Sequence, residues 1–325
     1  MNGIKSIEEA GASKPRKPHY AMLRTIWADL AMKKFKLSTE NTIPEAINAI
    51  LLSLFATIRK NKNDVLNRSD TESLHDYRVA IRRTRCLLSQ FKQVFHKQAI
   101  GHFRAEFFWL FGATSKVRDM DVHLEHLQYY KTLLPATTEH DLLLLNQHLL
   151  AEQAMAYDEM VKVLGSGRYQ KLLTDWSVFL YTPKTMKAQF ANRPIGHFAD
   201  KRIRLNYLAI LKQGQSITLD TPDEIFHDLR KRCKKLRYLL EFFGEFYPDE
   251  NTEKLLNSLK RLQDNLGAHQ DLCVQIQFLQ QLPPAKQVAW QLLVEVLQNQ
   301  KQQLRAEFKT HFDGFTKIRM PSLNN

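Results

Sequence analysis

Two stretches of the sequence place arginine and lysine at successive turns of a helix, each next to a histidine. LHDYRVAIRRTRCLLSQFKQVF begins at Leu74, and FHDLRKRCKKLRYLLEFFGEFY begins at Phe226. Guanidinium groups bind phosphate oxygens in bidentate pairs, and ammonium groups bind them as point charges. The candidate phosphate ligands are therefore His75, Arg78, Arg82, Arg83 and Arg85 in the first stretch, and His227, Arg230, Lys231, Lys234, Lys235 and Arg237 in the second.

In each stretch the apolar residues form one stripe of a helix, and most of the cations lie beside that stripe. Successive residues stand about 100° apart around a helix axis, which predicts burial of Tyr77, Ile81, Thr84, Leu88, Phe91 and Phe95, and of Leu229, Cys233, Leu236, Leu240, Phe243 and Tyr247. Like charges at successive turns repel one another, and positions 77–95 and 229–240 contain no Asp or Glu. We therefore expect a polyanion to neutralise the cations; an ordinary solvated helix face is the alternative.

The two stretches are copies of one unit. They align without gaps at an offset of 227 − 75 = 152, which places Arg78 on Arg230 and Arg85 on Arg237. The same offset places Asp119 on Asp271, so that one register covers about 80 residues of each half. This predicts a duplicated unit of about four helices, with repeat one at about 41–190 and repeat two at about 193–320.

The elements that position these residues are all predicted to be helices. From Ile43 onward, apolar residues recur at spacings of three and four, and neither strand alternation nor hairpin turns are found. Residues 1–36 are predicted to form a partly flexible N-terminal arm outside the domain at 37–320. We expect an all-α fold of two four-helix bundles related by a pseudo-two-fold axis, forming one compact unit with a basic central pore. The expected helices are 44–60, 71–95, 100–130, 138–164, 166–180, 196–212, 222–246, 250–281 and 284–311.

The bulk composition favours an anionic partner. The chain has 47 Lys and Arg against 34 Asp and Glu, a formal net charge of +13, which favours nucleic acid, an anionic membrane surface or a phosphate-rich ligand. Its apolar runs are shorter than the ~18 residues that a membrane span requires. Three widely spaced cysteines make no disulfide framework. These features predict a cytoplasmic protein without membrane insertion, and they leave its oligomeric state open.

The double motif resembles the CHAD family, the conserved histidine α-helical domain, over about residues 40–315. The family's pattern is His-x-x-Arg-x-x-x-[Arg/Lys]-[Arg/Lys]-x-Arg, present twice, and both Arg118 to Val122 and Leu262 to Gly267 followed by Asp271 also resemble it. The resemblance implies two four-helix bundles whose basic surface and central pore bind inorganic polyphosphate, with association with polyphosphate granules. It adds Arg118 to the candidate ligands. Gln270 occupies the matching position in repeat two, so the two sides need not bind equally.

Two other functions compete with this one. Proteins that bind RNA or DNA usually interleave exposed aromatic side chains with the cations, whereas Phe91 and Phe243 fall on the buried stripes. A phosphoanhydride-cleaving enzyme could hold a metal on Asp119 and Asp271, but the sequence has no P-loop, no Glu-x-Glu-x-Lys and no His-Glu-x-x-His motif. We therefore expect no enzymatic activity and no cofactor.

The roles of the histidines stay open at this stage. His75 and His227 could position other residues, contact phosphate or bind metal, because a histidine beside an apolar stripe suits each of these roles. His123 and His126 stand three residues apart, a spacing that we interpret as a solvated pair.

Overall fold

The computed structural model describes residues 37–181, 186–247, 250–281 and 287–321. The predicted N-terminal arm at 1–36 lies outside this range. Within it every regular element is helical, with two isolated β-bridges, and no described helix is long and apolar enough to cross a membrane. The prediction of an all-helical fold is confirmed.

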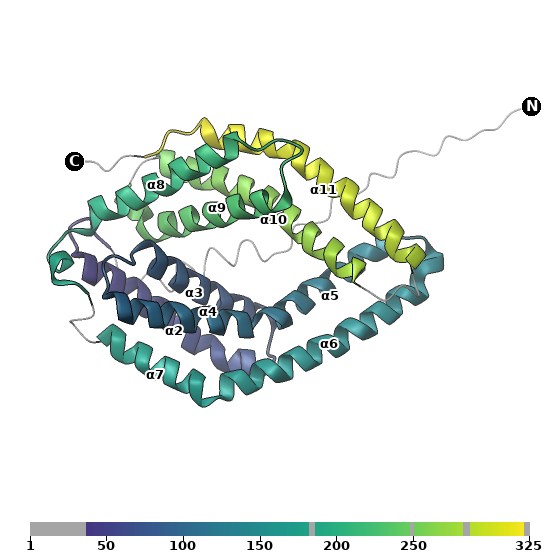
Figure 1. Ribbon diagram of the computed structural model, residues 1–325, viewed down its shortest axis with the longest axis horizontal. Coiled ribbons are helices and arrows are strands. Elements are labelled where there is room, and N and C mark those ends of the chain that lie inside the picture. Colours follow the sequence, from purple (N-terminus) through teal and green to yellow (C-terminus); the bar gives the residue numbers. More distant parts are fainter. Residues whose placement is uncertain (1–36, 182–185, 248–249, 282–286, 322–325) are drawn as a thin grey trace, which may run out of the picture. The chain divides into compact units, whose positions relative to one another are not determined.

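The described helices follow the predicted order (Figure 1). They are α2 (Ile43–Leu66), α3 (Thr71–Gln90), α4 (Lys97–Ala113), α5 (Ser115–Leu133), α6 (Glu139–Gly165), α7 (Gly167–Tyr181), α8 (Ile195–Gln215), α9 (Asp223–Phe243), α10 (Glu250–Gln280) and α11 (Gln287–Thr316). Short 3₁₀ turns lie at Ala136–Thr138, Ala188–Phe190 and Gly244–Phe246. The helix predicted at 100–130 is wrong in one respect, because it is interrupted at Thr114 and becomes α4 and α5.

Caps fix where the first two helices begin. At α2, the Thr42 hydroxyl accepts a hydrogen bond from the Glu45 backbone N–H at 3.4 Å, and the Glu45 carboxylate accepts one from the Thr42 N–H at 2.9 Å. This capping box satisfies two N–H groups that the helix itself leaves without acceptors. At α3, the Asp70 carboxylate accepts from the Ser73 N–H at 2.5 Å. The first basic stretch therefore starts at a defined residue.

The predicted apolar stripes are the buried faces of α3 and α9 and of the turns that follow them. Tyr77, Ile81, Leu88, Phe91 and Phe95 are all 0% exposed, and Thr84 is 1% exposed. In the second copy Leu229, Cys233, Leu236, Leu240, Phe243 and Tyr247 are at most 2% exposed. Both stripes are confirmed, so the cations beside them lie at the edge of the core.

Helices pack in the same order in both halves. Helix α2 packs on α3 as α8 packs on α9, α3 packs on α4 as α9 packs on α10, and α5 packs on α6 as α10 packs on α11. Adding 152 to the residue numbers converts each pair of the first half into the corresponding pair of the second. Helices α4 and α5 together correspond to the continuous helix α10. The two-fold relation between whole bundles stays a prediction.

Among the described residues, the two halves meet at two junctions besides the contact between α3 and α9. At the first, the Ile43 N–H donates to the Arg193 carbonyl at 2.8 Å, and the Ile195 N–H donates to the Asn41 carbonyl at 2.9 Å. Each bond is the counterpart of the other at an offset of 152, and the Thr42–Pro194 bridge joins equivalent residues. At the second junction, α5, α6, α10 and α11 share one apolar core, which includes the equivalent pairs Met120 and Leu272, Leu127 and Leu279, and Leu145 and Leu297.

Candidate anion-binding site

The candidate ligands form two rows, which we call the first ridge (His75, Arg78, Arg82, Arg83 and Arg85 on α3) and the second ridge (His227, Arg230, Lys231, Lys234, Lys235 and Arg237 on α9). Every member of the first ridge is buried or half-buried, and Arg78 is only 6% exposed. On the second ridge Lys231 is exposed and the others are half-buried. These cations are not a fully solvated helix face.

Arg78 is anchored by the break between α4 and α5. Its Nη1 donates to the Thr114 hydroxyl at 2.7 Å, to the Phe111 carbonyl at 3.2 Å and to the Ser115 hydroxyl at 3.3 Å. A cation is favoured at the C-terminal end of a helix, where carbonyl groups lack helical partners. Burial and the neighbouring charge of Arg82 lower the pKa of Arg78 to about 10, so it remains cationic at neutral pH.

Arg230, the counterpart of Arg78, has a looser environment. The continuous helix α10 places Gly267 where repeat one has Ser115, and a Cβ at Gly267 would lie 3.8 Å from Arg230 Nε. Arg230 Nη2 is 4.0 Å from Asp271 Oδ1. Burial lowers the pKa of Arg230, the charge of Asp271 opposes this, and the charge of Arg82 adds to it. Arg82 of the first half therefore lies near Arg230 of the second.

These interactions define a central cluster of five cations, Arg78, Arg82, Arg118, Arg230 and Lys234. Three carboxylates lie near it, Asp119, Asp121 and Asp271. The charge of Asp121 acts on Arg78, and the charge of Arg118 acts on Asp121. Burial raises the pKa of Asp119, opposed by Arg78 and Arg118, and burial raises the pKa of Asp271, opposed mainly by Arg230 and Lys234. The Asp271 side chain is nevertheless 53% exposed, which is expected of a carboxylate that water reaches from one side while protein surrounds it on the others. Cations outnumber the carboxylates, although Arg118 also pairs with Glu125 at 3.2 Å.

Several donors of this cluster have no acceptor within the described part of the chain. The Nε atoms of Arg78, Arg82 and Arg230 are buried and have no hydrogen-bond partner there. Leaving a buried donor unsatisfied costs about 1–3 kcal/mol, and more for a charged group. An anion that enters between the two ridges would supply the acceptors.

Three other members of the ridges lie outside the central cluster, at the contact between α3 and α9: Arg83, Lys235 and Arg237. Glu241 accepts hydrogen bonds from Arg83 across the halves and from Arg237 Nε, the latter at 2.7 Å. Burial raises the pKa of the Cys86 thiol, opposed by the charges of Lys235 and Arg83, so Lys235 lies here as well. Our expectation that no acidic residue neutralises the second ridge was incomplete. Positions 229–240 contain no Asp or Glu, but Glu241 stands directly after them.

Aromatic side chains lie along the first ridge, which the sequence analysis missed. The guanidinium carbon of Arg85 lies 5.0 Å from the ring centre of Phe108 and 5.1 Å from that of Phe111. Those of Arg78 and Arg82 lie 4.3 and 5.9 Å from Phe111. Phe108 is 66% exposed. The run of four aromatic residues within 107–111 was the available signal, because a helix cannot bury a ring at every position of such a run.

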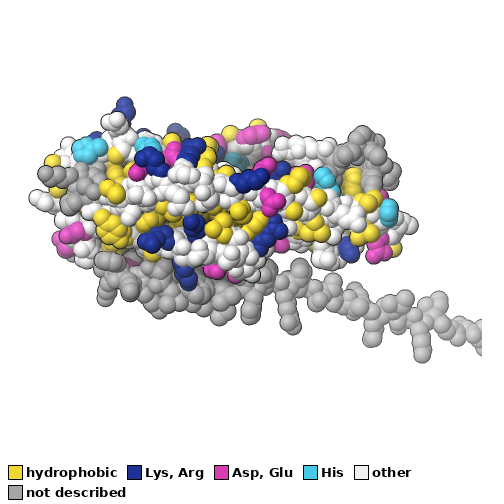
Figure 2. All heavy atoms as spheres, turned by 90° about the horizontal axis from the view of Figure 1, so that it is seen from below, with side chains coloured by type: hydrophobic (Ala, Val, Ile, Leu, Met, Phe, Trp, Pro, Cys, Tyr) yellow, Lys and Arg dark blue, Asp and Glu magenta, His cyan; other side chains and the backbone are white. Residues whose placement is uncertain are grey.

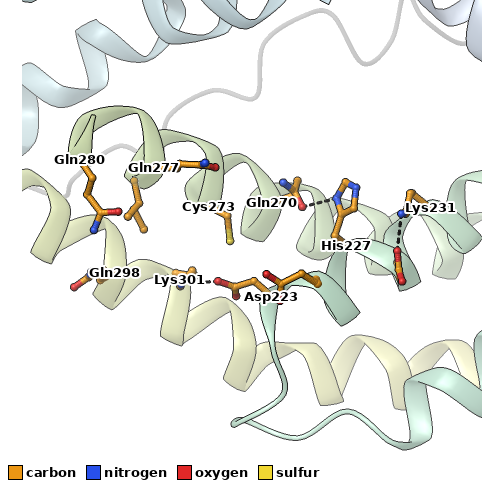
Figure 3. A pocket seen from close by; sticks show the side chains of 12 residues that line it. Asp223, His227, Lys231, Gln270, Cys273, Gln277, Gln280, Gln298 and Lys301 are labelled. Atoms are coloured by element: carbon orange, nitrogen blue, oxygen red, sulfur yellow. Dashed lines mark hydrogen bonds and ion pairs between the residues drawn. The ribbon is translucent and has the colours of Figure 1, made fainter. Parts of the chain in front are cut away.

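His227 and Lys231 line a pocket between α9, α10 and α11 (Figure 3). The pocket has a volume of about 610 Å³, and amide, thiol and charged side chains line it. His227 Nδ1 lies 2.5 Å from Gln270 Oε1, and Lys231 Nζ lies 2.5 Å from Asp228 Oδ1. In this repeat the histidine is therefore hydrogen-bonded to Gln270, the residue that stands in the place of Arg118.

One group of metal-ligand types borders this pocket. Atoms of Asp223, His269 and Cys273 lie within 4.8 Å of one another. Asp223 already accepts from Arg305 Nη2 at 2.6 Å and from Lys301 Nζ at 3.0 Å. Burial opposes its ionisation, but these two cations and His269 outweigh burial and hold the pKa of Asp223 at about 2. A metal ion would have to displace two cations, so we interpret this group as an ion network that joins the start of α9 to α11.

His123 is not solvated, so the interpretation of His123 and His126 as a solvated pair was wrong. His123 is 3% exposed, its ring stacks on Phe278 at 4.1 Å, and burial lowers its pKa to about 4. His126 is half-buried, and burial lowers its pKa too, opposed by the charge of Asp271. Both residues belong to the junction between α5 and α10.

The net positive charge is not gathered into one patch on the face seen in Figure 2. There Lys and Arg side chains are interspersed with acidic and hydrophobic ones. The composition alone therefore does not indicate a candidate site, whereas the geometry of the central cluster does.

Comparisons with known proteins identify the family and the fold. The family model described as "CHAD domain" matches residues 49–280, which contain both ridges. The CHAD domain from the plant Ricinus communis is 26% identical, with a TM-score of 0.75 over 89% of this chain and 97% of that one. PptA from Streptomyces chartreusis shares the fold, with 17% identity and a TM-score of 0.66 over 84% of this chain and 100% of that one. The comparison with curated proteins gave no match. By the family model, which covers more than half of its residues, the chain belongs to the CHAD domain family.

Proposed function

We propose that this protein binds inorganic polyphosphate between the two ridges, with the central cluster as the main site. The observation that carries the proposal is the position of Arg82, whose charge acts on Arg78 of its own half and on Arg230 of the other. One linear ligand can therefore contact both halves at once. Polyphosphate carries about one charge per phosphate and no bases, so a site of Lys and Arg matches it along its length.

The cations of the central cluster have different roles in the proposed site. Arg82, Arg230, Lys234 and Arg118 would contact phosphate oxygens, while Arg78 is held by the helix break and would act mainly through its charge. Asp119 and Asp271 limit the affinity. We propose that the cluster binds the polyphosphate chain without cleaving it.

The proposal includes the finer architecture. The reciprocal bonds at 41–43 and 193–195 and the equivalent pairs in the shared core support two bundles related by a two-fold axis, with the ridges lining a basic pore. Such a protein would associate with polyphosphate granules in the cytoplasm. Imaging a fluorescent fusion alongside a polyphosphate stain tests that location.

A competition experiment tests the proposal directly. Long-chain polyphosphate and single-stranded RNA of equal total charge compete for the protein at fixed salt. We expect polyphosphate to bind at least about tenfold more tightly, which is ~1.4 kcal/mol, and its affinity to fall steeply with salt because several counterions are released. Equal competition would indicate a generic polyanion binder.

RNA binding is the second candidate, and one observation favours it. The exposed ring of Phe108 beside Arg85 is the kind of aromatic surface on which bases stack. A preference for RNA in the competition would make this the main function.

A further inference from the structure

The first ridge ends at an exposed aromatic ring. Phe108 of α4 keeps 66% of its surface accessible, and the guanidinium of Arg85 lies over the ring at 5.0 Å from its centre. Arg85 itself is half-buried, and burial and the charge of Arg82 lower its pKa. An exposed ring beside an arginine is a surface on which a nucleobase can stack.

The helix surface around this ring is open. On a helix the neighbours of Phe108 on the same face are Arg104, Ala105, Phe111 and Gly112. A Cβ built on Gly112 would meet no described atom within 4 Å. Ala105 and Gly112 are themselves exposed, and Arg104 is an exposed cation one turn away.

The ring is continuous with the central cluster. Arg85, Arg82 and Arg78 all lie beside the Phe111 ring, at 5.1, 5.9 and 4.3 Å from its centre. The charge of Arg82 also acts on Arg230 of the other half. The order along the ridge is thus the exposed ring first, then Arg85 and Arg82, then the cations shared by the two halves. A ligand with a flat apolar end and an anionic chain has this same order.

Repeat two lacks the aromatic surface. At an offset of 152, Phe108 corresponds to Lys260 and Phe111 to Gln263, and Lys260 is exposed. Within the described part of the chain, the second ridge therefore offers no exposed ring at the position that corresponds to Phe108. Single-stranded RNA presents a base at every phosphate, whereas one stacking position suits one base at the end of a phosphate chain.

We propose that Phe108 and Arg85 form a stacking site for the nucleobase of a nucleoside oligophosphate, whose phosphate chain follows Arg82 into the central cluster. The inference rests on the proposed function, because the same cations hold the phosphates. Base stacking on an aromatic ring is tolerant of base identity, since every base has a π face. The site therefore selects for the presence of a base more than for which base it is.

The test compares adenosine 5′-tetraphosphate with inorganic tetraphosphate by titration calorimetry at fixed salt. The inorganic ion has one more ionisable oxygen, so charge alone favours it. We expect the nucleotide to bind at least about tenfold more tightly, which is ~1.4 kcal/mol. Phe108→Ala should bring the affinity for the nucleotide down to that for inorganic tetraphosphate, and Phe108→Tyr should keep the preference. Tyr181→Ala, which removes an exposed ring from α7, is the matched control.

The possible failures are distinguishable. Equal affinity for the two tetraphosphates, or a preference that survives in Phe108→Ala, would overturn the stacking site and leave the polyphosphate proposal standing. If neither tetraphosphate binds while long-chain polyphosphate does, the stacking site is again wrong. If long-chain polyphosphate does not bind either, the proposed function itself fails. An RNA homopolymer that binds more tightly per charge than the nucleotide would also contradict a single stacking position.

Discussion

Phe91 and Phe243 align with each other at the offset of 152, and their ring centroids lie 5.7 Å apart. Both rings are 0% exposed. Equivalent residues of a duplicated unit contact each other only where the two copies face one another directly. The contact between α3 and α9 is such a place, and it holds the two ridges side by side.

The losses of stability on removing these two rings should not be additive. We expect Phe91→Ala to lower the free energy of unfolding by about 3–5 kcal/mol, because it opens a cavity in the core. The double variant with Phe243→Ala should lose less than the sum of the single losses, by about 0.5–1.5 kcal/mol, because the contact is lost only once. Urea unfolding measures all three. The pair Phe91→Ala and Phe315→Ala should instead be additive, and additivity in both pairs would contradict the direct contact.

The neighbouring residues Arg82 and Arg83 should respond differently to removal. Arg82→Ala should weaken polyphosphate binding about tenfold, or ~1.4 kcal/mol, and reduce the slope of log affinity against log salt by about 1. Arg83 contacts Glu241, so Arg83→Ala should lower the stability more than the affinity. Filter binding over a range of salt concentrations and urea unfolding separate the two effects. Equal losses of affinity would show that the ridge binds as a whole.

Removing the carboxylate of Asp271 should tighten binding. Burial raises its pKa above the ordinary value of 3.8, so on acidification it takes up a proton earlier than a solvated Asp and stops opposing the anion. We expect Asp271→Asn to bind polyphosphate about fivefold more tightly at pH 7, or ~1 kcal/mol, and to gain less than the wild type between pH 7 and pH 5. Asp264→Asn, on an exposed part of the same helix, should change neither value. A wild-type affinity that falls on acidification would contradict this.

His123 should make the protein less stable in acid. Its folded pKa is about 4 against 6.5 for a solvated histidine, so below pH 6.5 the unfolded chain binds a proton that the folded chain does not. Stability therefore falls as pH decreases from 6.5 towards 4. In His123→Phe this contribution is absent. The free energy of unfolding of this variant, relative to that of the wild type, should therefore increase by roughly 2 kcal/mol as the pH falls from 7 to 5. Urea unfolding at both values measures it, with exposed His140→Gln as control; parallel changes would refute the assignment.

Much of the helical layout was predictable because the signal is local. The stripe from Tyr77 to Phe95 repeats every three or four residues, and each of its six predicted members is buried. Thr42 and Pro44 mark the start of α2 in the sequence as clearly as in the structure. The offset of 152 also anticipated which helices correspond.

The sequence did not predict which cations form the central cluster and which form ion pairs elsewhere, because this depends on contacts between distant segments. Glu241 neutralises Arg83 from 158 residues away, and no pattern within α3 indicates this. Arg78 is anchored because the helix is interrupted at Thr114. The sequence predicted an uninterrupted helix there. The burial of His123 was not predictable either, because a spacing of three residues does not reveal that Phe278 of α10 stacks on its ring.

The hydrogen bonds between residues 41–43 and 193–195 have a consequence for how such a molecule can arise. In each half an isoleucine N–H, at 43 or 195, donates to the other half, and the carbonyl two residues before it accepts from the other half. The two subunits of an isologous homodimer exchange contacts in the same way. A half-length chain carries the whole of this complementary surface and needs only a second copy of itself to satisfy it. Fusion of two such subunits into one chain then lets their ridges differ, as they do at Phe108 and Lys260.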